Sequence, residues 1–130
     1  MIPEVEKAIE EIKTLFDGHR VEIIPEEQGG AHVVIHDLDI GTAYVPQSSW
    51  CGFTISYQYP RGQVYPHYLD PSVQRADGQA LSAGFFPNQS WPAKPGQTVL
   101  MVSRGSNRWN MMVDTAATKL MQVLDWVSTR

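Results

Sequence analysis

The sequence predicts an α+β domain in which two helices pack against a small antiparallel sheet. Three observations lead to this fold class. Apolar residues at helical spacing mark a helix at each end of the chain, and short apolar or alternating segments between them are typical of strands. The first strands follow one another closely, which favours an antiparallel meander. With 130 residues, the chain is long enough for one domain with one core, so residues 1–130 are treated as a single unit.

The first helix is predicted for Ile2 to Phe16. Pro3 suits the first turn of a helix, and Gly18 is a good residue to end one. One face of this helix is apolar and the other is charged, so it should lie on the sheet. Its apolar residues are Val5, Ala8, Ile9, Ile12, Leu15 and Phe16.

Three strands are expected next, at Val21–Ile24, Ala31–Ile35 and Gly52–Tyr59. Pro25 to Gly30 should form the turn between the first two. The third strand shows the clearest alternation, because every second residue along it is apolar. These apolar residues are Phe53, Ile55, Tyr57 and Tyr59.

A long proline-rich flap is predicted after the third strand. Pro60 cannot donate to a strand ladder, and no regular element is expected from there to Pro95. Loops this long in compact domains are usually functional or disordered, and the aromatic residues of this one favour packing over disorder. Thr98–Ser103 is either a fourth strand or a buried extended segment. A polar loop containing Trp109 then leads to the last helix.

The last helix is predicted for Asp114 to Ser128, with Asp114 as its N-terminal cap. Like the first helix, it should turn one apolar face towards the sheet. The residues of that face are Ala117, Leu120, Met121, Leu124 and Val127.

Composition and charge exclude several classes of function. The net charge is −4, so we expect neither a nucleic-acid partner nor a membrane surface as partner. No apolar run approaches the roughly 20 residues of a membrane helix, and the acidic N-terminus does not resemble a secretory signal. Cys51 is the only cysteine, which rules out a disulfide within the chain and fits a cytoplasmic protein. We expect no cofactor.

Several motifs, taken in order, resemble the ubiquitin-conjugating (E2, or UBC) superfamily, including RWD and inactive E2-variant domains. They are Tyr59-Pro60, Tyr65-Pro66, Pro71-Ser72-Val73 and Trp109 just before the last helix. The likeness is greatest to divergent bacterial E2-like proteins of ubiquitin-like conjugation systems, some of which act in antiviral defence. The resemblance implies a UBC/RWD-like fold and a ubiquitin-like protein or an E1-like activating enzyme as partner.

The resemblance also implies a catalytic cysteine that this chain lacks. The family spacing back from Trp109 falls on Met101, whose thioether has no proton to lose. Ser103 is the nearest hydroxyl and would form an oxyester if a base activated it. The family's His-Pro-Asn signature is missing, but Phe86-Pro87-Asn88 retains its Pro-Asn, so the resemblance suggests Asn88 as the counterpart of the oxyanion-supporting asparagine. Cys51 is either a relocated nucleophile or, as lone cysteines usually are, a small buried hydrophobe.

The histidines leave a metal site open as an alternative. His32 and His36 would share one face of a strand, with Asp37 and Asp39 nearby and His67 in the flap. However, no pair has a spacing specific for zinc, so surface histidines are the more ordinary interpretation and no metal is predicted.

Binding residues are expected in the flap and in the polar loop before the last helix. Flap residue His67 would either contact a partner or hydrogen-bond to loop backbone. The polar loop could form an anion or carboxylate site or be a plain solvated turn. The predicted binding residues are Tyr65, Pro66, His67, Arg104, Asn107, Arg108 and Trp109.

Three hypotheses about function follow. The leading one is an E2-like component of a bacterial ubiquitin-like pathway that lacks the standard cysteine and acts by binding a protein. The second is a conjugating enzyme with displaced chemistry at Ser103 or Cys51. The third is an unrelated domain that binds a small ligand or a metal.

Overall fold

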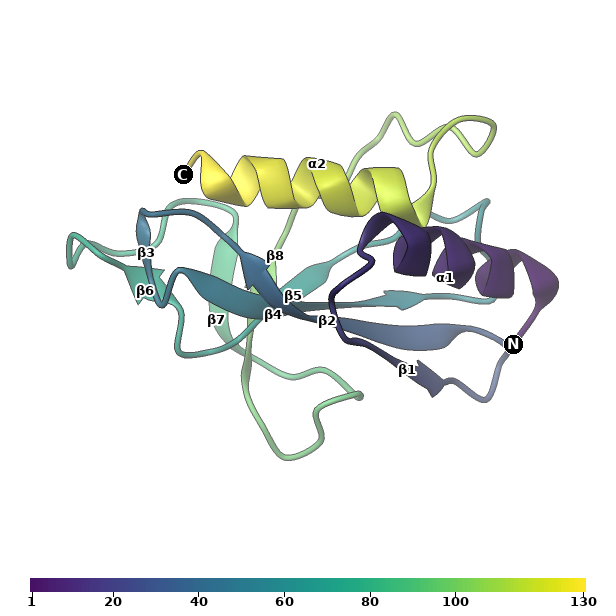
Figure 1. The fold of residues 1–130 in the computed structure, drawn as a ribbon, viewed down its shortest axis with the longest axis horizontal. Helices are drawn as coiled ribbons and strands as arrows, with labels where there is room; N and C mark the ends of the chain where they lie inside the picture. Colours follow the sequence, from purple (N-terminus) through teal and green to yellow (C-terminus); the bar gives the residue numbers. More distant parts are fainter.

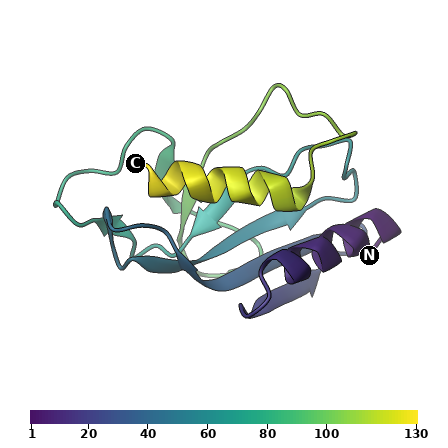
Figure 2. The same ribbon diagram turned by 45° about the horizontal axis from the view of Figure 1, so that its top comes forward.

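Two helices lie on one face of a six-stranded sheet, which confirms the predicted α+β class (Figures 1 and 2). The computed structural model describes all 130 residues. The helices are α1 (Pro3–Leu15) and α2 (Ala116–Ser128). The strands of the main sheet, in spatial order, are β1 (Val21–Pro25), β2 (Ala31–Asp39), β4 (Ser48–Ile55), β5 (His67–Leu69), β8 (Val99–Val102) and β7 (Phe85–Gln89).

Every neighbouring pair of strands in this sheet is antiparallel. The predicted meander is confirmed for β1, β2 and β4, and β5 continues it. The meander ends there, because β8 lies between β5 and β7. Thr98–Ser103 is thus a strand in the interior of the sheet, where both its neighbours form backbone hydrogen bonds with it.

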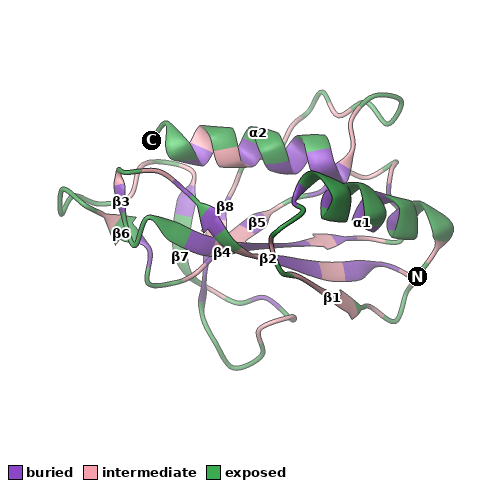
Figure 3. Ribbon diagram, viewed as in Figure 1, coloured by how far each residue is buried: buried purple, intermediate pink, exposed green.

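One row of side chains crosses the sheet on the face that the helices cover. Pairing along β1, β2, β4, β5, β8 and β7 aligns one residue from each strand, and five of the six are apolar. The helices close over this row with Val5, Ile12 and Leu120 among others, so their undersides are buried (Figure 3). The residues of the row are Ile23, Val33, Phe53, His67, Val102 and Phe85.

Helix α1 confirms its prediction to within one residue at each end. Val5, Ala8, Ile9 and Ile12 are buried, while Leu15, which was predicted on the same stripe, is half exposed beyond the edge of the sheet contact. Gly18 has a φ of +96°, a conformation that glycine adopts without strain. Neither helix is both long and apolar enough to cross a membrane.

Helix α2 begins two residues later than predicted, and its cap is different. Thr115 is the N-cap: its side chain accepts from the Thr118 N–H at 3.1 Å, and the Thr118 hydroxyl oxygen accepts from the Thr115 N–H at 2.9 Å. This reciprocal pair satisfies two of the free N–H groups at the start of the helix. Asp114, the predicted cap, instead accepts from the Asn110 N–H at 2.7 Å.

The buried face of α2 is also rotated from the predicted one. Met121 is half exposed and Leu124 only partly buried, whereas Lys119 and Val123 face inwards. Helical spacing shows which residues of the helix form its apolar face. Packing against the sheet decides which of those residues become buried. Lys119, which was not on the predicted apolar face, is thereby buried.

The third predicted strand starts and ends four residues too late along the chain. Strand β4 starts at Ser48 and ends at Ile55, because the Tyr59 N–H donates to the Ser56 carbonyl at 3.0 Å and closes a turn there. Residues 56–66 then form an irregular segment between β4 and β5, which we call the connecting segment. Tyr57, predicted to share a face with Phe53, is 45% exposed.

Regular structure exists between Pro60 and Pro95, where none was predicted. Strands β5 and β7 lie there, together with β6 (Gln74–Arg75). These strands have two to five residues, which is too short for an alternating pattern to be detected. Neighbouring strands, rather than local sequence, determine their conformation.

The opposite face of the sheet is covered by residues 90–97, which loop beneath it (Figure 1). Trp91 is buried there, stacked between Trp50 at 6.2 Å and Tyr68 at 5.0 Å between ring centroids, and it donates to the Thr54 hydroxyl at 3.0 Å. The Trp91 ring lies directly on Gly52, where no Cβ would fit. A small second core is therefore built on this face.

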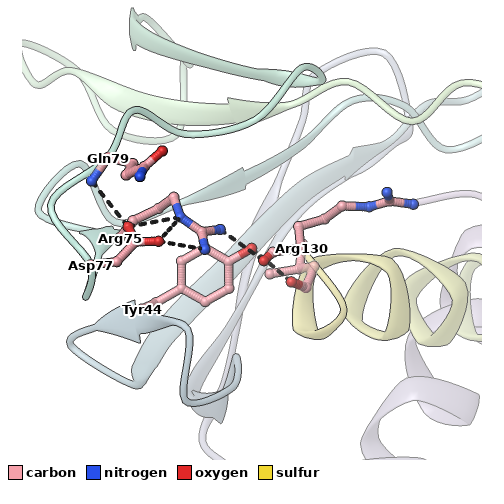
Figure 4. A network of polar contacts seen from close by, with 6 residues as sticks. Tyr44, Arg75, Asp77, Gln79 and Arg130 are labelled. Carbon is pink, nitrogen blue, oxygen red and sulfur yellow. Dashed lines mark hydrogen bonds and ion pairs between the residues drawn. The ribbon is translucent and has the colours of Figure 1, made fainter.

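A second, two-stranded sheet of β3 (Tyr44–Val45) and β6 is tied to the end of α2 (Figure 4). The buried Tyr44 hydroxyl donates to the Val127 carbonyl at 2.7 Å. Arg75 donates to the Arg130 carbonyl at 2.8 Å and pairs with Asp77 at 3.0 Å. These groups satisfy one another, so we assign this network a structural role.

Candidate functional site

The polar loop of residues 103–110 is fastened to the connecting segment by side-chain hydrogen bonds, and we call it the latched loop. Gln63 provides two of them: its Nε2 donates to the Ser106 carbonyl at 2.7 Å, and its Oε1 accepts from the Ser106 N–H at 2.8 Å. Trp109 Nε1 donates to the Pro60 carbonyl at 2.7 Å, and the Tyr65 and Ser103 hydroxyls are 2.5 Å apart.

These contacts hold the loop in one conformation. A glutamine amide carries both a donor and an acceptor, so Gln63 satisfies both backbone groups of Ser106 as a neighbouring strand would. Sequence reasoning missed Gln63, because nothing local distinguishes it from a solvated polar residue. The two segments are 43 positions apart, so only the folded chain brings them together.

We expect Gln63→Ala to release the latched loop. The two hydrogen bonds with Ser106, of about 1 kcal/mol each, and the long contact with Lys119 Nζ are lost, so the free energy of unfolding should fall by about 2 kcal/mol or more. Amide hydrogen exchange at Ser106 should accelerate by more than tenfold. Gln58→Ala is the matched control, because the Gln58 side chain is exposed in the same segment and makes no hydrogen bond. Equal exchange rates at Ser106 in both variants would contradict the latch.

Two cavities lie between the latched loop and α2. The first has a volume of about 220 Å³, and the charged groups that line it are Arg104 and Lys119, with no acidic residue. The second, of about 200 Å³, lies beside it and is lined by Arg108 and Asp114 as well as Lys119. Lys119 borders both, so it is the central charge of the site.

Lys119 is a buried cation without an ion-pair partner. The residue is 5% exposed, and no carboxylate lies within ion-pair distance. Its Nζ has one polar contact, a long one of 3.4 Å to Gln63 Oε1. Burial, and then the positive charge of Arg104, lower the pKa of Lys119, while Asp114 opposes this shift. An anion in the cavity would relieve both effects.

Arg104 is oriented by the ring of Trp126. Its guanidinium carbon lies 4.7 Å from the ring centroid, and that of Arg130 lies 4.8 Å from the same centroid. Such stacking holds the planar guanidinium while leaving its N–H donors available. Arg104 can therefore present forked donors at the wall of the first cavity.

The remaining predicted binding residues have different positions. Arg108 and Trp109 line the second cavity, and Tyr65 contacts Ser103, as described above. Pro66 is half buried. Asn107 is exposed and lines neither cavity. Sequence reasoning thus found the loop residues of the site but missed Lys119 and Gln122, which α2 supplies.

Both predictions for His67 are wrong: it is neither a surface contact nor a ring that hydrogen-bonds to loop backbone. It lies in β5, fully buried, with its ring 5.2 Å from that of Phe53, and neither ring nitrogen has a hydrogen-bond partner. Burial, with a smaller effect of the Lys119 charge, lowers the pKa of His67 to about 3. The ring is therefore neutral at pH 7.

The three candidates considered for a catalytic role, Ser103, Cys51 and Asn88, are not brought together. Cys51 is fully buried, and burial raises the pKa of its thiol to about 12, so it is a core residue. Met101 lies within β8, paired with Tyr68 and Phe86. Ser103 has only the Tyr65 hydroxyl as side-chain partner, so no base activates it.

Asn88 does not approach Ser103 either. Ser103 follows Val102, which pairs with Phe85 at the start of β7, while Asn88 lies three residues further along that edge strand. At about 3.3 Å per residue, this is roughly 10 Å along the strand. Asn88 has a φ of +61° at an irregular position of β7, where its side chain is exposed.

The three histidines considered as metal ligands are not brought together. His32 Nδ1 is 2.8 Å from the Thr54 hydroxyl, and His36 Nε2 is 3.0 Å from a Glu22 carboxylate oxygen. His67 belongs to the buried row on the helix-covered face of the sheet. No group of three or more His, Cys, Asp or Glu side chains has a geometry that could hold a metal ion.

The site is therefore a latched loop with a cationic cavity on its α2 side, and it lacks an activated nucleophile. Comparison with protein-family models, with curated proteins and with solved structures finds no match to the chain.

Proposed function

We propose that the chain is a non-catalytic protein-binding domain whose partner docks on the latched loop and on the three residues that follow Asn110. The observation that carries the proposal is the exposure of those residues: Met111 is 46%, Met112 82% and Val113 69% exposed. Consecutive apolar side chains on an ordered surface are typical of protein interfaces, and methionine adapts well to a partner.

Charge indicates what the partner's surface is like. The latched loop contributes the exposed cations Arg104 and Arg108 to the docking surface, whereas Met111 and Met112 border a cavity that Glu4, Glu11 and Asp114 also line. A partner segment with acidic groups opposite the latched loop and apolar side chains opposite Met111 and Met112 would complement it. Because opposite charges speed encounter, association should slow as salt is added.

The resemblance to bacterial E2-like proteins suggests the partner's class. In this proposal the fold is UBC/RWD-like, the connecting segment is part of the family's proline-rich flap, and the partner is a ubiquitin-like protein or an E1-like activating enzyme. The buried thiol of Cys51 supports a binding role, because a thioester needs an accessible thiolate.

The binding proposal is tested by Met112→Ser with a ubiquitin-like protein and an E1-like enzyme of the source organism, each titrated separately. Loss of one buried methionine contact should weaken binding about tenfold, since such a contact contributes roughly 1.5 kcal/mol. Met121→Ser is the matched control, because Met121 is a half-exposed methionine on α2 outside the docking surface. If both variants bind as the wild type does, or if neither protein binds at all, this assignment is wrong.

The non-catalytic part of the proposal has its own test. Incubation with the activating enzyme, ATP and the ubiquitin-like protein should leave the intact mass of the chain unchanged. A thiol-sensitive adduct that Cys51→Ser abolishes would establish a thioester enzyme instead. A thiol-resistant adduct that Ser103→Ala abolishes would establish an oxyester at Ser103.

A further inference from the structure

One cavity differs from the other large cavities in its charge. Each of the other four is lined by at least one acidic residue as well as by lysine or arginine. The cavity between the latched loop and α2 is lined by Arg104 and Lys119 without any acid, although acidic residues outnumber basic ones in the chain. Two positive charges that share an uncompensated cavity repel each other, and a bound anion would remove that repulsion.

We infer that this cavity binds the phosphoryl group of a phosphorylated serine or threonine in the partner protein. The inference rests on the proposed protein-binding function and specifies the chemistry that the partner must carry. A phosphomonoester carries about −1.5 to −2 charges at pH 7, which matches the two cations, whereas a carboxylate would neutralise only one of them.

The cavity also supplies the donors that phosphoryl oxygens accept. Arg104, held over Trp126, offers forked N–H donors, and Lys119 offers a buried ammonium with only one long hydrogen bond. The Ser106 hydroxyl accepts from the Arg108 N–H, so its own proton is free to point towards an oxyanion. The side-chain amide of Gln122, which also lines the cavity, makes no hydrogen bond within the chain.

The surroundings favour a protein over a nucleotide as the source of the phosphoryl group. Trp126 is the aromatic ring of this cavity, and two guanidinium groups and the Phe85 ring, at 5.1 Å, already pack against it. A base that stacked on this ring would have to compete with these three groups. The exposed apolar residues 111–113 follow the latched loop along the chain and precede α2, on the stretch that the proposed protein partner covers.

Inorganic phosphate is the first probe. Titration at constant ionic strength and pH 7.5 should give saturable amide shifts at Ser106, Lys119 and Gln122, and acetate should bind at least tenfold more weakly. Arg104→Gln and Lys119→Met should each weaken phosphate binding at least tenfold. Arg20→Gln is the matched control, because Arg20 is exposed and paired with Glu22 on β1, and it should bind phosphate as the wild type does.

Three results would overturn the phosphoryl assignment. They are a linear, unsaturable response to phosphate, equal affinity for acetate, and wild-type affinity in Arg104→Gln. Because Arg104 is an exposed surface residue, that variant keeps the test valid even if Lys119→Met fails to fold.

Peptides then identify the source. A phosphoserine peptide with flanking apolar residues should bind at least tenfold more tightly than its unphosphorylated form and more tightly than adenosine monophosphate. Tighter binding of the nucleotide would overturn the protein source. Partner binding that does not depend on phosphorylation would sink this inference and leave the proposed function standing. Phosphate binding without any protein partner would establish the anion site but overturn both the proposed function and the protein source of the phosphoryl group.

Discussion

The free energy of unfolding should fall by about 2–3 kcal/mol between pH 6 and pH 4, and His67→Leu should remove most of that loss. The His67 ring is neutral in the fold, with a pKa of about 3 compared with 6.5 for a free histidine. Between these values the unfolded chain binds a proton that the folded chain does not, so stability is lost as pH falls. One such group contributes about 1.4 kcal/mol per pH unit.

The physical cause of this acid sensitivity is the position of His67 in an apolar row. Phe53 and Val102 flank it in the register, Lys119 is close enough to oppose a second positive charge, and no acceptor stabilises a protonated ring. Leucine has a similar volume and leaves no polar atom unsatisfied. At pH 7.5, His67→Leu should therefore be as stable as the wild type or more stable.

Urea unfolding followed by tryptophan fluorescence at pH 7.5, 6, 5 and 4 measures this effect. His36→Gln is the matched control. It removes a partly exposed imidazole and the hydrogen bond that lowers the pKa of Glu22, so it should lose that acid-sensitive contribution and keep the larger loss due to His67. Lys119→Met should reduce the loss on acidification, because it removes the charge that disfavours protonation of His67. Parallel pH profiles for the wild type and His67→Leu would show that another group causes the acid sensitivity.

Phe53→Ala should lower the free energy of unfolding by about 3–5 kcal/mol, while Tyr57→Ala should change it by less than about 0.5 kcal/mol. Phe53 is fully buried at the centre of the row that the helices cover. Its removal leaves a cavity that the paired backbones of β2, β4 and β5 cannot close. Tyr57 is 45% exposed in the turn after β4 and lies outside the buried row, so its truncation loses little packing.

Both variants are measured by urea unfolding at pH 7.5, where His67 is neutral in the folded and unfolded chain. The sequence alternation makes Phe53 and Tyr57 equivalent, whereas the structure separates them. Losses of similar size at the two positions would mean that β4 continues through Tyr57 and that the turn at Ser56 is wrong.

Local periodicity predicted the helices well and the short strands poorly. The bounds of α1 follow from the apolar stripe and from Gly18, which act within a few residues of each other. Strands β5, β6 and β7 have no such local signal, because each consists of a few residues whose conformation depends on strands distant in sequence. The N-cap of α2 could not be predicted from the sequence either. Asp114 and Thr115 are both good capping residues, and only the backbone geometry selects Thr115.

The candidate site could be predicted in part. The run of Arg104 to Trp109 was found because its polar residues stand out between a strand and a helix, and it lies at the site. Gln63 and Lys119 could not be found that way. Gln63 acts on a backbone 43 positions away, and Lys119 faces inwards only because of how α2 is rotated on the sheet.

Composition and spacing were enough to establish the α+β class, the two helices, the first antiparallel strands and the polar loop, because these depend on interactions between residues that are near in sequence. The chemistry of the molecule depended on contacts between distant segments. Antiparallel pairing of β5 with β4 and β8 buried His67, and the core buried Cys51. The packing of α2 placed Lys119 opposite Arg104 in a cavity without an acid. Burial and charge pairing are properties of the folded chain. They decided between the open alternatives for Cys51, which is a core residue, made His67 a core residue too, and placed a helical lysine at the centre of the candidate site.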